Sequence, residues 1–168
     1  MNVKVFNCRS NSEDEAKILL ITKNKNKLPS ISSGWRFNFN KHSKKKEHKT
    51  YTLTTLINPD VVEGCLIINT KTDFHVYMAF VEVAPHNKGN KRMYDKVAGC
   101  LIAFACRQSF MNDKEGYVAF DVIEEKVEDE IKLMTLYSQK YNAVRLKNTT
   151  TMIILPEGSE KLITEYLN

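Results

Sequence analysis

The chain has 168 residues, of which 42% are apolar and 27% charged, and its formal net charge is +5. This balance is typical of one soluble globular domain, which we expect to span residues 1–168. The longest uncharged apolar run, Val97–Cys106, is far shorter than the roughly 20 residues of a membrane-spanning helix. The N-terminal MNVKVFNCR has no hydrophobic signal core, so we expect a cytoplasmic protein without a membrane partner.

The positive charge is concentrated in Lys41–Lys49, whereas Glu115–Glu130 is acidic. A lysine run of this kind is most often solvated surface. The alternative is an anionic partner, either nucleic acid or the phosphates of a cofactor.

Cysteine and histidine spacing argues against a metal site or a disulfide framework. The cysteines form no CxxC motif and no Cys/His zinc pattern. Three of them lie in apolar stretches, where we expect buried free thiols. The residues concerned are Cys8, Cys65, Cys100, Cys106 and the isolated His75 and His86.

The N-terminal part predicts a strand over Val3–Arg9. Ser12–Glu15 has the spacing of a capping box, which predicts a helix that continues to Ile21. Ser30–Lys49 is polar with alternating aromatic residues, and it fits either a short strand or a loop. Those aromatic residues, Trp35, Phe37 and Phe39, would form a satellite cluster or wall an acceptor pocket.

Three strands joined by short turns follow, and links of only a few residues predict antiparallel neighbours. They cover Thr50–Ile57, Val61–Asn69 and Phe74–Ala84. The apolar run from Val97 predicts a buried helix, and Gly116–Val122 predicts the next strand. Strand, crossover helix and strand make a βαβ unit, so Gly116–Val122 should lie parallel to Phe74–Ala84.

The C-terminal part predicts two helices around a hairpin. The hairpin joins Ala143–Leu146 to Thr150–Leu155, and it could expose an edge for a homodimer. The predicted fold class is therefore α+β, with a mixed, mostly antiparallel sheet and one parallel βαβ unit. The helices are Glu128–Lys140, with Ile131, Met134 and Leu136 toward the core, and Gly158–Leu167, with Leu162, Ile163, Tyr166 and Leu167 inward.

The loop HNKGNKRMYD brings Lys88, Lys91 and Arg92 to the start of the helix at Val97. Free helical N–H groups beside cations are suited to holding phosphate. The order of elements from about Tyr51 to Leu155 resembles the GCN5-related N-acetyltransferase (GNAT) superfamily. The chain looks closest to a bacterial subgroup with EVAPHNKGNKRMY, a helix ending in ACRQSF, a GYVAF strand and LYSQKYNA.

This resemblance implies an acetyl-coenzyme A-dependent N-acetyltransferase, with acetyl-CoA between two parallel strands that splay apart. Backbone groups near Val81 and Val83 would pair with the pantetheine arm. The pyrophosphate would bind amides from Arg92 to Ala98, a stretch that includes Lys96 and Val97, with Lys91 and Arg92 supplying positive charge.

The phosphate loop departs from the superfamily pattern Gln/Arg-x-x-Gly-x-Gly/Ala. Met93 stands at the Gln/Arg position and Lys96 at the first glycine position. Without that glycine, a side chain obstructs the close approach of the backbone to phosphate.

Two residues are candidates for acid–base chemistry. Glu82 is the only acidic residue in its apolar strand, where burial favours a general base; the alternative is a carboxylate paired with a loop lysine or Arg92. By resemblance, Tyr137 would protonate the coenzyme A thiolate, with Tyr141 as an alternative one turn later. Neither Cys106 nor Ser109 has a nearby histidine, which argues against covalent catalysis.

The acceptor would be a small molecule or a peptide with a primary amine, or a charged tRNA. Two other functions remain open: a non-catalytic module that binds acyl-CoA or a protein, and an RNA-binding domain built on the basic segments.

Overall fold

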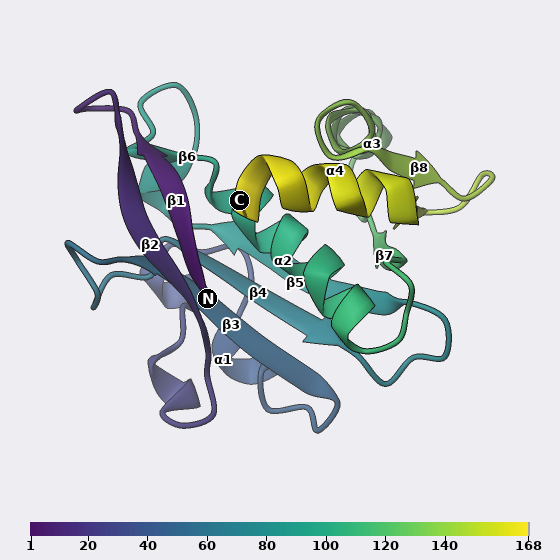
Figure 1. Ribbon diagram of the computed structural model, residues 1–168, viewed down its shortest axis with the longest axis horizontal. Coiled ribbons are helices and arrows are strands. Elements are labelled where there is room, and N and C mark those ends of the chain that lie inside the picture. The colour runs from purple at the N-terminus through teal and green to yellow at the C-terminus, as the bar shows by residue number, and fades with distance from the viewer. Residues whose placement is uncertain (168) are drawn as a thin grey trace.

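The computed structural model describes residues 1–167, which form one nine-stranded sheet with its longer helices on one face (Figure 1). The strands are β1 (Asn2–Asn7), β2 (Ser12–Leu20), β3 (His48–Thr55), β4 (Gly64–Asn69), β5 (Val76–Val83), β6 (Tyr94–Asp95), β7 (Val118–Asp121), β8 (Ala143–Arg145) and β9 (Thr151–Ile154). Their spatial order is β6-β1-β2-β3-β4-β5-β7-β9-β8. The helices are α1 (Phe39–His42), α2 (Val97–Met111), α3 (Val127–Tyr141) and α4 (Pro156–Leu167), with short 3-10 turns η1 (Lys25–Lys27), η2 (Ile31–Ser33) and η3 (Pro85–Asn87).

The sheet confirms the expected α+β class. β5 and β7 are parallel, and the other neighbouring pairs are antiparallel. The crossover from β5 to β7 runs through α2, as the βαβ pattern predicts. The predicted hairpin near the C-terminus is also present as β8 and β9.

The helix expected from Ser12 to Ile21 is wrong, because these residues form β2 instead. Two alternate residues of this segment, Ala16 and Ile18, are buried, whereas Leu19 and Leu20 are about half exposed. This is the period of a strand with one face on the core. The capping-box spacing at Ser12 is coincidental, since a tight turn pairs the segment with β1 along its length.

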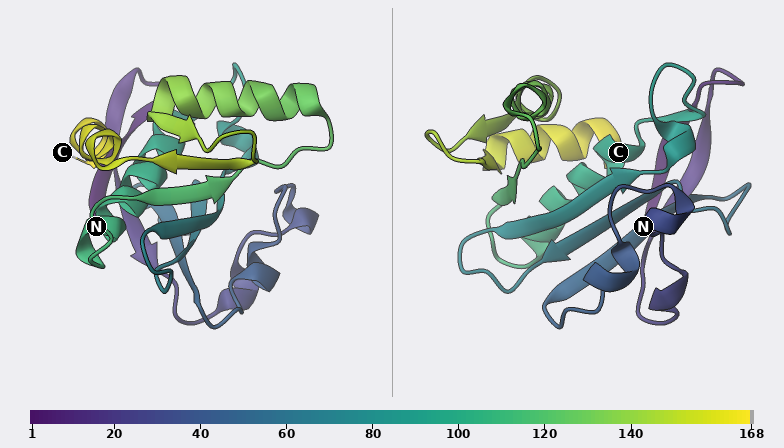
Figure 2. Two further views of the ribbon diagram at one scale, coloured as in Figure 1. Left: turned by 90° about the vertical axis from the view of Figure 1, so that its right-hand side faces the viewer. Right: turned by 180° about the vertical axis from the view of Figure 1, so that it is seen from behind.

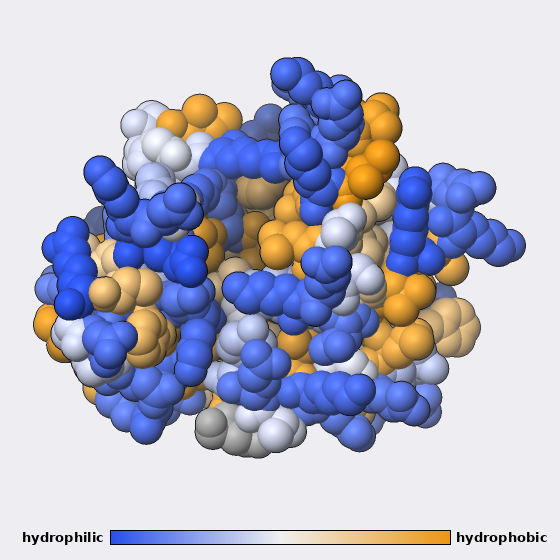
Figure 3. All heavy atoms as spheres, turned by 90° about the horizontal axis from the view of Figure 1, so that it is seen from above, coloured by the Kyte–Doolittle hydropathy of each residue, from blue (hydrophilic) through white to orange (hydrophobic). Residues whose placement is uncertain are grey.

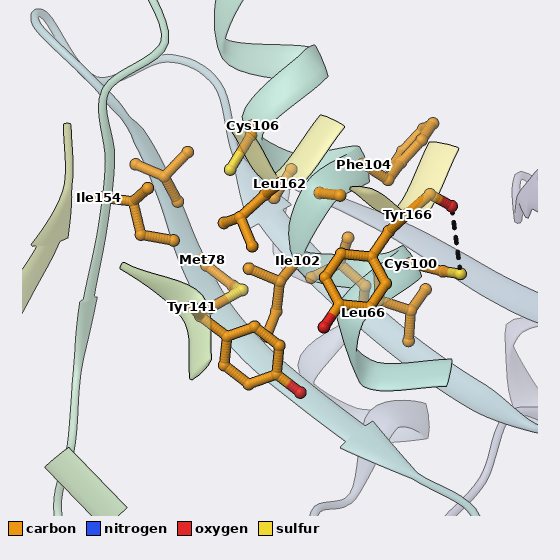
Figure 4. Close-up of a cluster of buried hydrophobic side chains, with 14 of the residues drawn as sticks. Leu66, Met78, Cys100, Ile102, Phe104, Cys106, Tyr141, Ile154, Leu162 and Tyr166 are labelled. Atoms are coloured by element: carbon orange, nitrogen blue, oxygen red, sulfur yellow. Dashed lines mark hydrogen bonds between the residues drawn. The ribbon is translucent and has the colours of Figure 1, made fainter. Parts of the chain in front are cut away.

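The main core lies between the sheet and the pair α2 and α4 (Figure 4). Leu66 and Met78 from the sheet meet Ile102 from α2 and Leu162 from α4. Gly99 is required at this contact, because a Cβ atom there would lie 2.1 Å from the ring of Tyr166. The last helix packs as predicted, with Leu162 and Tyr166 buried and Ile163 and Leu167 partly buried against the core.

Helix α3 lies at the β8 end of the sheet and runs across the top of the molecule in the left view of Figure 2. Of the three residues expected to face the core, Met134 is buried, but Ile131 and Leu136 are 53% and 47% exposed. That part of the prediction is wrong because α3 packs chiefly on the short β8 and leaves much of its circumference open. Figure 3, which looks onto the face that carries α3 and α4, shows apolar patches interrupted by hydrophilic side chains.

The segment from Ser30 to Lys49 covers the opposite face of the sheet with η2, α1 and connecting loops, visible at the lower right of Figure 2, left. Trp35 and Phe39 are buried there against Cys65 and Ile67, so the expected satellite cluster exists. The lysines of Lys41–Lys49 are exposed and make no ion pair within the described residues, as solvated surface would.

Three cysteines are buried and free as expected, and Cys8 is exposed. Burial raises the pKa of the Cys100 and Cys106 thiols to about 12. Among residues 1–167, no helix has both the length and the apolar character needed to cross a membrane.

Candidate active site

A β-bulge in β5 sets the geometry of the site. Phe80 pairs with Ile67 and Met78 pairs with Ile68, which leaves Ala79 as the extra residue between them. A bulge reverses the alternation of side chains along the strand. Before it, Val76 and Met78 face α2; after it, Val81 and Val83 face α2, and Glu82 points to the opposite face.

Beyond the bulge, β5 has no strand partner on the side of β7. The two strands pair at Val76–Val118 and Tyr77–Ala119 and at no further positions in the described chain. The Ala84 amide donates to the Glu63 carbonyl on the β4 side. Because backbone groups of alternate residues point to opposite sides of a strand, those of Val81 and Val83 point into the gap.

A cavity of about 410 Å³ fills this gap, within the size range of small-molecule sites. Its apolar wall comes from β5, α2 and α3, and includes Val81, Val83, Ala98, Ile102 and Leu133. Its polar wall lies toward the loop before α1 and the segment after β7. The charged residues of the lining are Arg36, Glu82, Lys88, Asp121 and Glu124.

Tyr137 lies on the apolar wall, with its ring centroid 4.7 Å from that of Phe120 and 5.8 Å from that of Tyr141. Its hydroxyl has no hydrogen-bond partner among residues 1–167. Burial raises the pKa of Tyr137 to about 12, so the hydroxyl keeps its proton at neutral pH. Tyr141 also lines the cavity but is more deeply buried.

Glu82 lies on the polar wall and already has three hydrogen-bond donors. The amides of Arg36 and Phe37 donate to its two carboxylate oxygens over 2.8 and 3.1 Å, and Lys88 Nζ is 2.6 Å from Oε1. The side chain is 5% exposed. The alternative given for Glu82, a pairing with a loop lysine, is therefore present, with Lys88 as the partner. Glu82 anchors the loop before α1 to β5, and only part of its acceptor capacity is left for a substrate.

Sequence reasoning missed an ion pair in the lining of the cavity. Arg36 Nη1 lies 2.6 Å from Glu124 Oε1, and Nη2 donates to the Ile123 carbonyl over 3.2 Å. The guanidinium also lies 5.0 Å from the ring centroid of Phe37. No local pattern indicates this contact, since the two residues are 88 positions apart in the chain.

The loop that would hold phosphate has Lys96 where the superfamily pattern has its first glycine, and its backbone conformation reflects that position. Lys96, at the usual glycine position, adopts φ = 68° immediately before α2. This left-handed conformation favours glycine, the residue that the superfamily pattern has at this position. The Lys96 side chain extends away from the cavity to Glu13 on β2, 3.2 Å distant.

The carboxylate of Asp95 lies at the start of α2, where the phosphate would bind. Its Oδ1 accepts from the Lys96 amide over 2.8 Å, and its Oδ2 pairs with Arg92 Nη2 at 3.2 Å. These contacts hold the pKa of Asp95 below its ordinary value, although burial acts in the opposite direction. Arg92 is therefore paired with Asp95, and the Lys91 side chain is exposed.

A buried network fixes the two ends of this loop, and sequence reasoning missed it as well. Glu63 is 1% exposed and accepts from Asn87 Nδ2 over 2.7 Å, while Asn87 Oδ1 accepts from the Tyr94 amide. His86 Nε2 lies 2.6 Å from the same Glu63 carboxylate. Within the described residues, no three histidine, cysteine or carboxylate side chains gather in a way that would hold a metal ion.

Of the predicted cofactor residues, Val81, Val83 and Ala98 line the cavity together with both predicted catalytic residues, Glu82 and Tyr137. Val97 is buried in the core at the start of α2. The cavity lining does not include Lys91, Arg92, Lys96 or Val97.

No protein-family model matches the sequence, and a search of curated proteins finds no match. Solved structures do match. The crystal structure of AtaTR bound with acetyl-CoA has a TM-score of 0.59 and 12% identity, over 89% of this chain and 98% of the other. A tyrosine-to-phenylalanine mutant of the AtaT toxin, bound to the C-terminus of the antitoxin AtaR, has a TM-score of 0.55 and 13% identity, over 90% and 99%.

A protein from Desulfovibrio desulfuricans that is assigned to the GNAT family of acetyltransferases matches with a TM-score of 0.55 and 10% identity, over 83% of this chain and 95% of the other. At these identities the likeness concerns the fold. The chain has the GNAT fold, as its order of elements predicts.

Proposed function

We propose that the protein is an acetyl-CoA-dependent N-acetyltransferase that transfers the acetyl group directly to a primary amine. The observation that carries this proposal is the cavity between β5 and β7, where unpaired strand backbone, a protonated tyrosine and a carboxylate meet. Solved proteins with this fold that hold acetyl-CoA support the choice of co-substrate.

In this reaction the pantetheine arm lies along β5, with its amides bonded to the backbone of Val81 and Val83. The first turn of α2, near Ala98, receives the pyrophosphate through its free N–H groups. The amine nitrogen attacks the thioester carbonyl, an N–C bond forms, and the C–S bond breaks. Glu82 takes the amine proton, directly or through water, and Tyr137 donates a proton to the departing thiolate.

The chemistry requires no covalent enzyme intermediate. The three buried thiols are poor nucleophiles, because burial raises the pKa of each and only the thiolate attacks readily. This agrees with a direct transfer.

The direct test measures release of free coenzyme A thiol from acetyl-CoA with a panel of primary amines. We expect amine-dependent release by the wild-type protein and little by the Tyr137→Phe variant. Release that is identical with and without amines, or absent with every amine although acetyl-CoA binds, would contradict the proposal.

A second candidate is a non-catalytic module that binds acyl-CoA or a protein on the same fold. Asp95 favours this reading, because its carboxylate already lies on the amide that phosphate would use. The binding of an antitoxin by the AtaT toxin supports a protein partner. A module of this kind would bind its ligand and show no amine-dependent thiol release.

A further inference from the structure

The charged groups of the cavity do not balance. The lining holds three carboxylates, those of Glu82, Asp121 and Glu124, against two cations. Lys88 is paired with Glu82 and Arg36 with Glu124. Asp121 is left with no cationic partner among the residues that the structure describes.

Asp121 is nevertheless held rigidly. Its Oδ2 accepts from the Tyr77 hydroxyl over 2.7 Å, and its Oδ1 accepts from the hydroxyls of Thr150 and Thr151 over 2.9 and 2.8 Å. These three hydrogen bonds keep the pKa of Asp121 below its ordinary value, although burial opposes them. The carboxylate is therefore charged at neutral pH and fixed in direction.

Its position places it on the polar wall. Val118 and Phe120 of β7 pack into the main core, so the alternation of the strand directs Asp121 to the face away from α2 and α3. Glu82 points to that same face after the bulge. Glu82 and Asp121 both line the cavity and present carboxylates to this face, and of the two only Glu82 has a cationic partner.

The proposed reaction assigns the amine proton to Glu82, so Asp121 is not needed as a base. A fixed carboxylate without a cationic partner is suited to an ammonium that does not react, because an anion favours the protonated form of a nearby amine. An acceptor with a negative group at this point would be repelled.

We propose that Asp121 binds a second, non-reacting ammonium group, so that the preferred acceptor is a diamine or polyamine. This proposal deepens the N-acetyltransferase function and rests on it for the identity of the reacting site. It makes Asp121 a specificity-determining residue, with Glu82 and Tyr137 left to the chemistry.

The test compares two ligands of the same carbon chain, cadaverine with two ammonium groups and n-pentylamine with one. Affinity is measured by NMR chemical-shift titration at constant ionic strength. We expect the wild-type protein to bind cadaverine about tenfold more tightly, as one charged hydrogen bond would provide. Asp121→Asn should reduce the ratio to about that of two independent amines, roughly twofold at most.

The matched control is Asp60→Asn, which removes an exposed turn carboxylate away from the cavity and should leave the tenfold ratio intact. Equal ratios in the wild-type and Asp121→Asn proteins, or no preference for cadaverine, would overturn the assignment. Acetyl-CoA binding is measured on the same samples. Its absence would overturn the proposed function, whereas the diamine ratio alone decides the role of Asp121.

Discussion

The two walls of the cavity are built in different ways. The apolar wall consists of regular elements, β5, α2 and α3, and presents backbone groups and a tyrosine whose hydroxyl is free. The polar wall combines loop residues with side chains from β5 and β7. Glu82 is paired with Lys88 and Arg36 with Glu124, whereas Asp121 has no cationic partner among the described residues. The apolar wall is suited to a cofactor arm common to many enzymes, and the polar wall to one acceptor.

The largest effect should come from the apolar wall. Tyr137→Phe removes the proton donor while it keeps the ring packed on Phe120, so kcat should fall about 100-fold. Acetyl-CoA affinity, measured by calorimetry, should stay within about twofold of wild type, since the lost hydroxyl makes no structural hydrogen bond. Tyr141→Phe is the matched control and should keep most of the activity. Equal losses of kcat in the two variants would contradict the assignment of the proton donor to Tyr137.

On the polar wall, Glu82→Gln should lower kcat roughly tenfold and also lower the melting temperature. The loss of stability follows because Gln keeps the shape, but its NH2 group cannot accept one of the two backbone N–H bonds from the loop before α1, at a cost of about 1–3 kcal/mol. Steady-state kinetics and thermal unfolding measure the two effects.

Lys88→Gln separates the two roles of Glu82. It breaks the ion pair from its exposed end and leaves the carboxylate in place, so turnover should remain near that of wild type. If Lys88→Gln reduces kcat as much as Glu82→Gln does, the carboxylate is an anchor and not a base.

A smaller effect is expected where the apolar wall begins. Lys96→Gly relieves a left-handed conformation and removes the side chain that the superfamily pattern lacks, so acetyl-CoA should bind about threefold more tightly. The loss of the exposed ion pair with Glu13 should cost little stability. Unchanged or weaker binding in a titration would mean that the loop does not contact phosphate at this residue.

The smallest expected effect concerns the pH dependence of kcat, which should show no descending limb due to Tyr137 in the ordinary tyrosine range. Because burial raises the pKa of Tyr137 to about 12, its hydroxyl stays protonated well above the ordinary tyrosine value. The proton donor is lost only as pH rises through the raised pKa, so kcat should not fall between about pH 8 and 10. A descending limb centred near 10 that disappears in Tyr137→Phe would show an unperturbed tyrosine.

The contrast between the two walls also separates the features that the sequence could predict from those that it could not. The βαβ unit and the terminal hairpin follow from apolar runs and short turns, which are local signals, whereas Tyr137 is indicated only by the resemblance to the superfamily. The helix expected from Ser12 to Ile21 is wrong because a cap-like spacing favours a helix there, the alternation of Ala16 and Ile18 favours a strand, and pairing with β1 decides the outcome.

The polar wall depends on contacts between distant parts of the chain. The Arg36 side chain reaches Glu124, and the amides of Arg36 and Phe37 donate to Glu82, with the partners 45 to 88 positions apart in the chain. One local signal was available: Asp121 is the only charged residue in GYVAFDV, as Glu82 is the only acid in its strand. The left-handed turn at Lys96 had no such signal, because the residue there is not glycine.

The central claim is that the gap between β5 and β7 binds acetyl-CoA along its pantetheine arm. Calorimetric titration of the wild-type protein with acetyl-CoA, and in parallel with ADP, tests it most directly. The account predicts saturable, one-to-one binding of acetyl-CoA and much weaker binding of ADP, which lacks the arm. No binding at millimolar acetyl-CoA, or equal affinity for the two ligands, would contradict it.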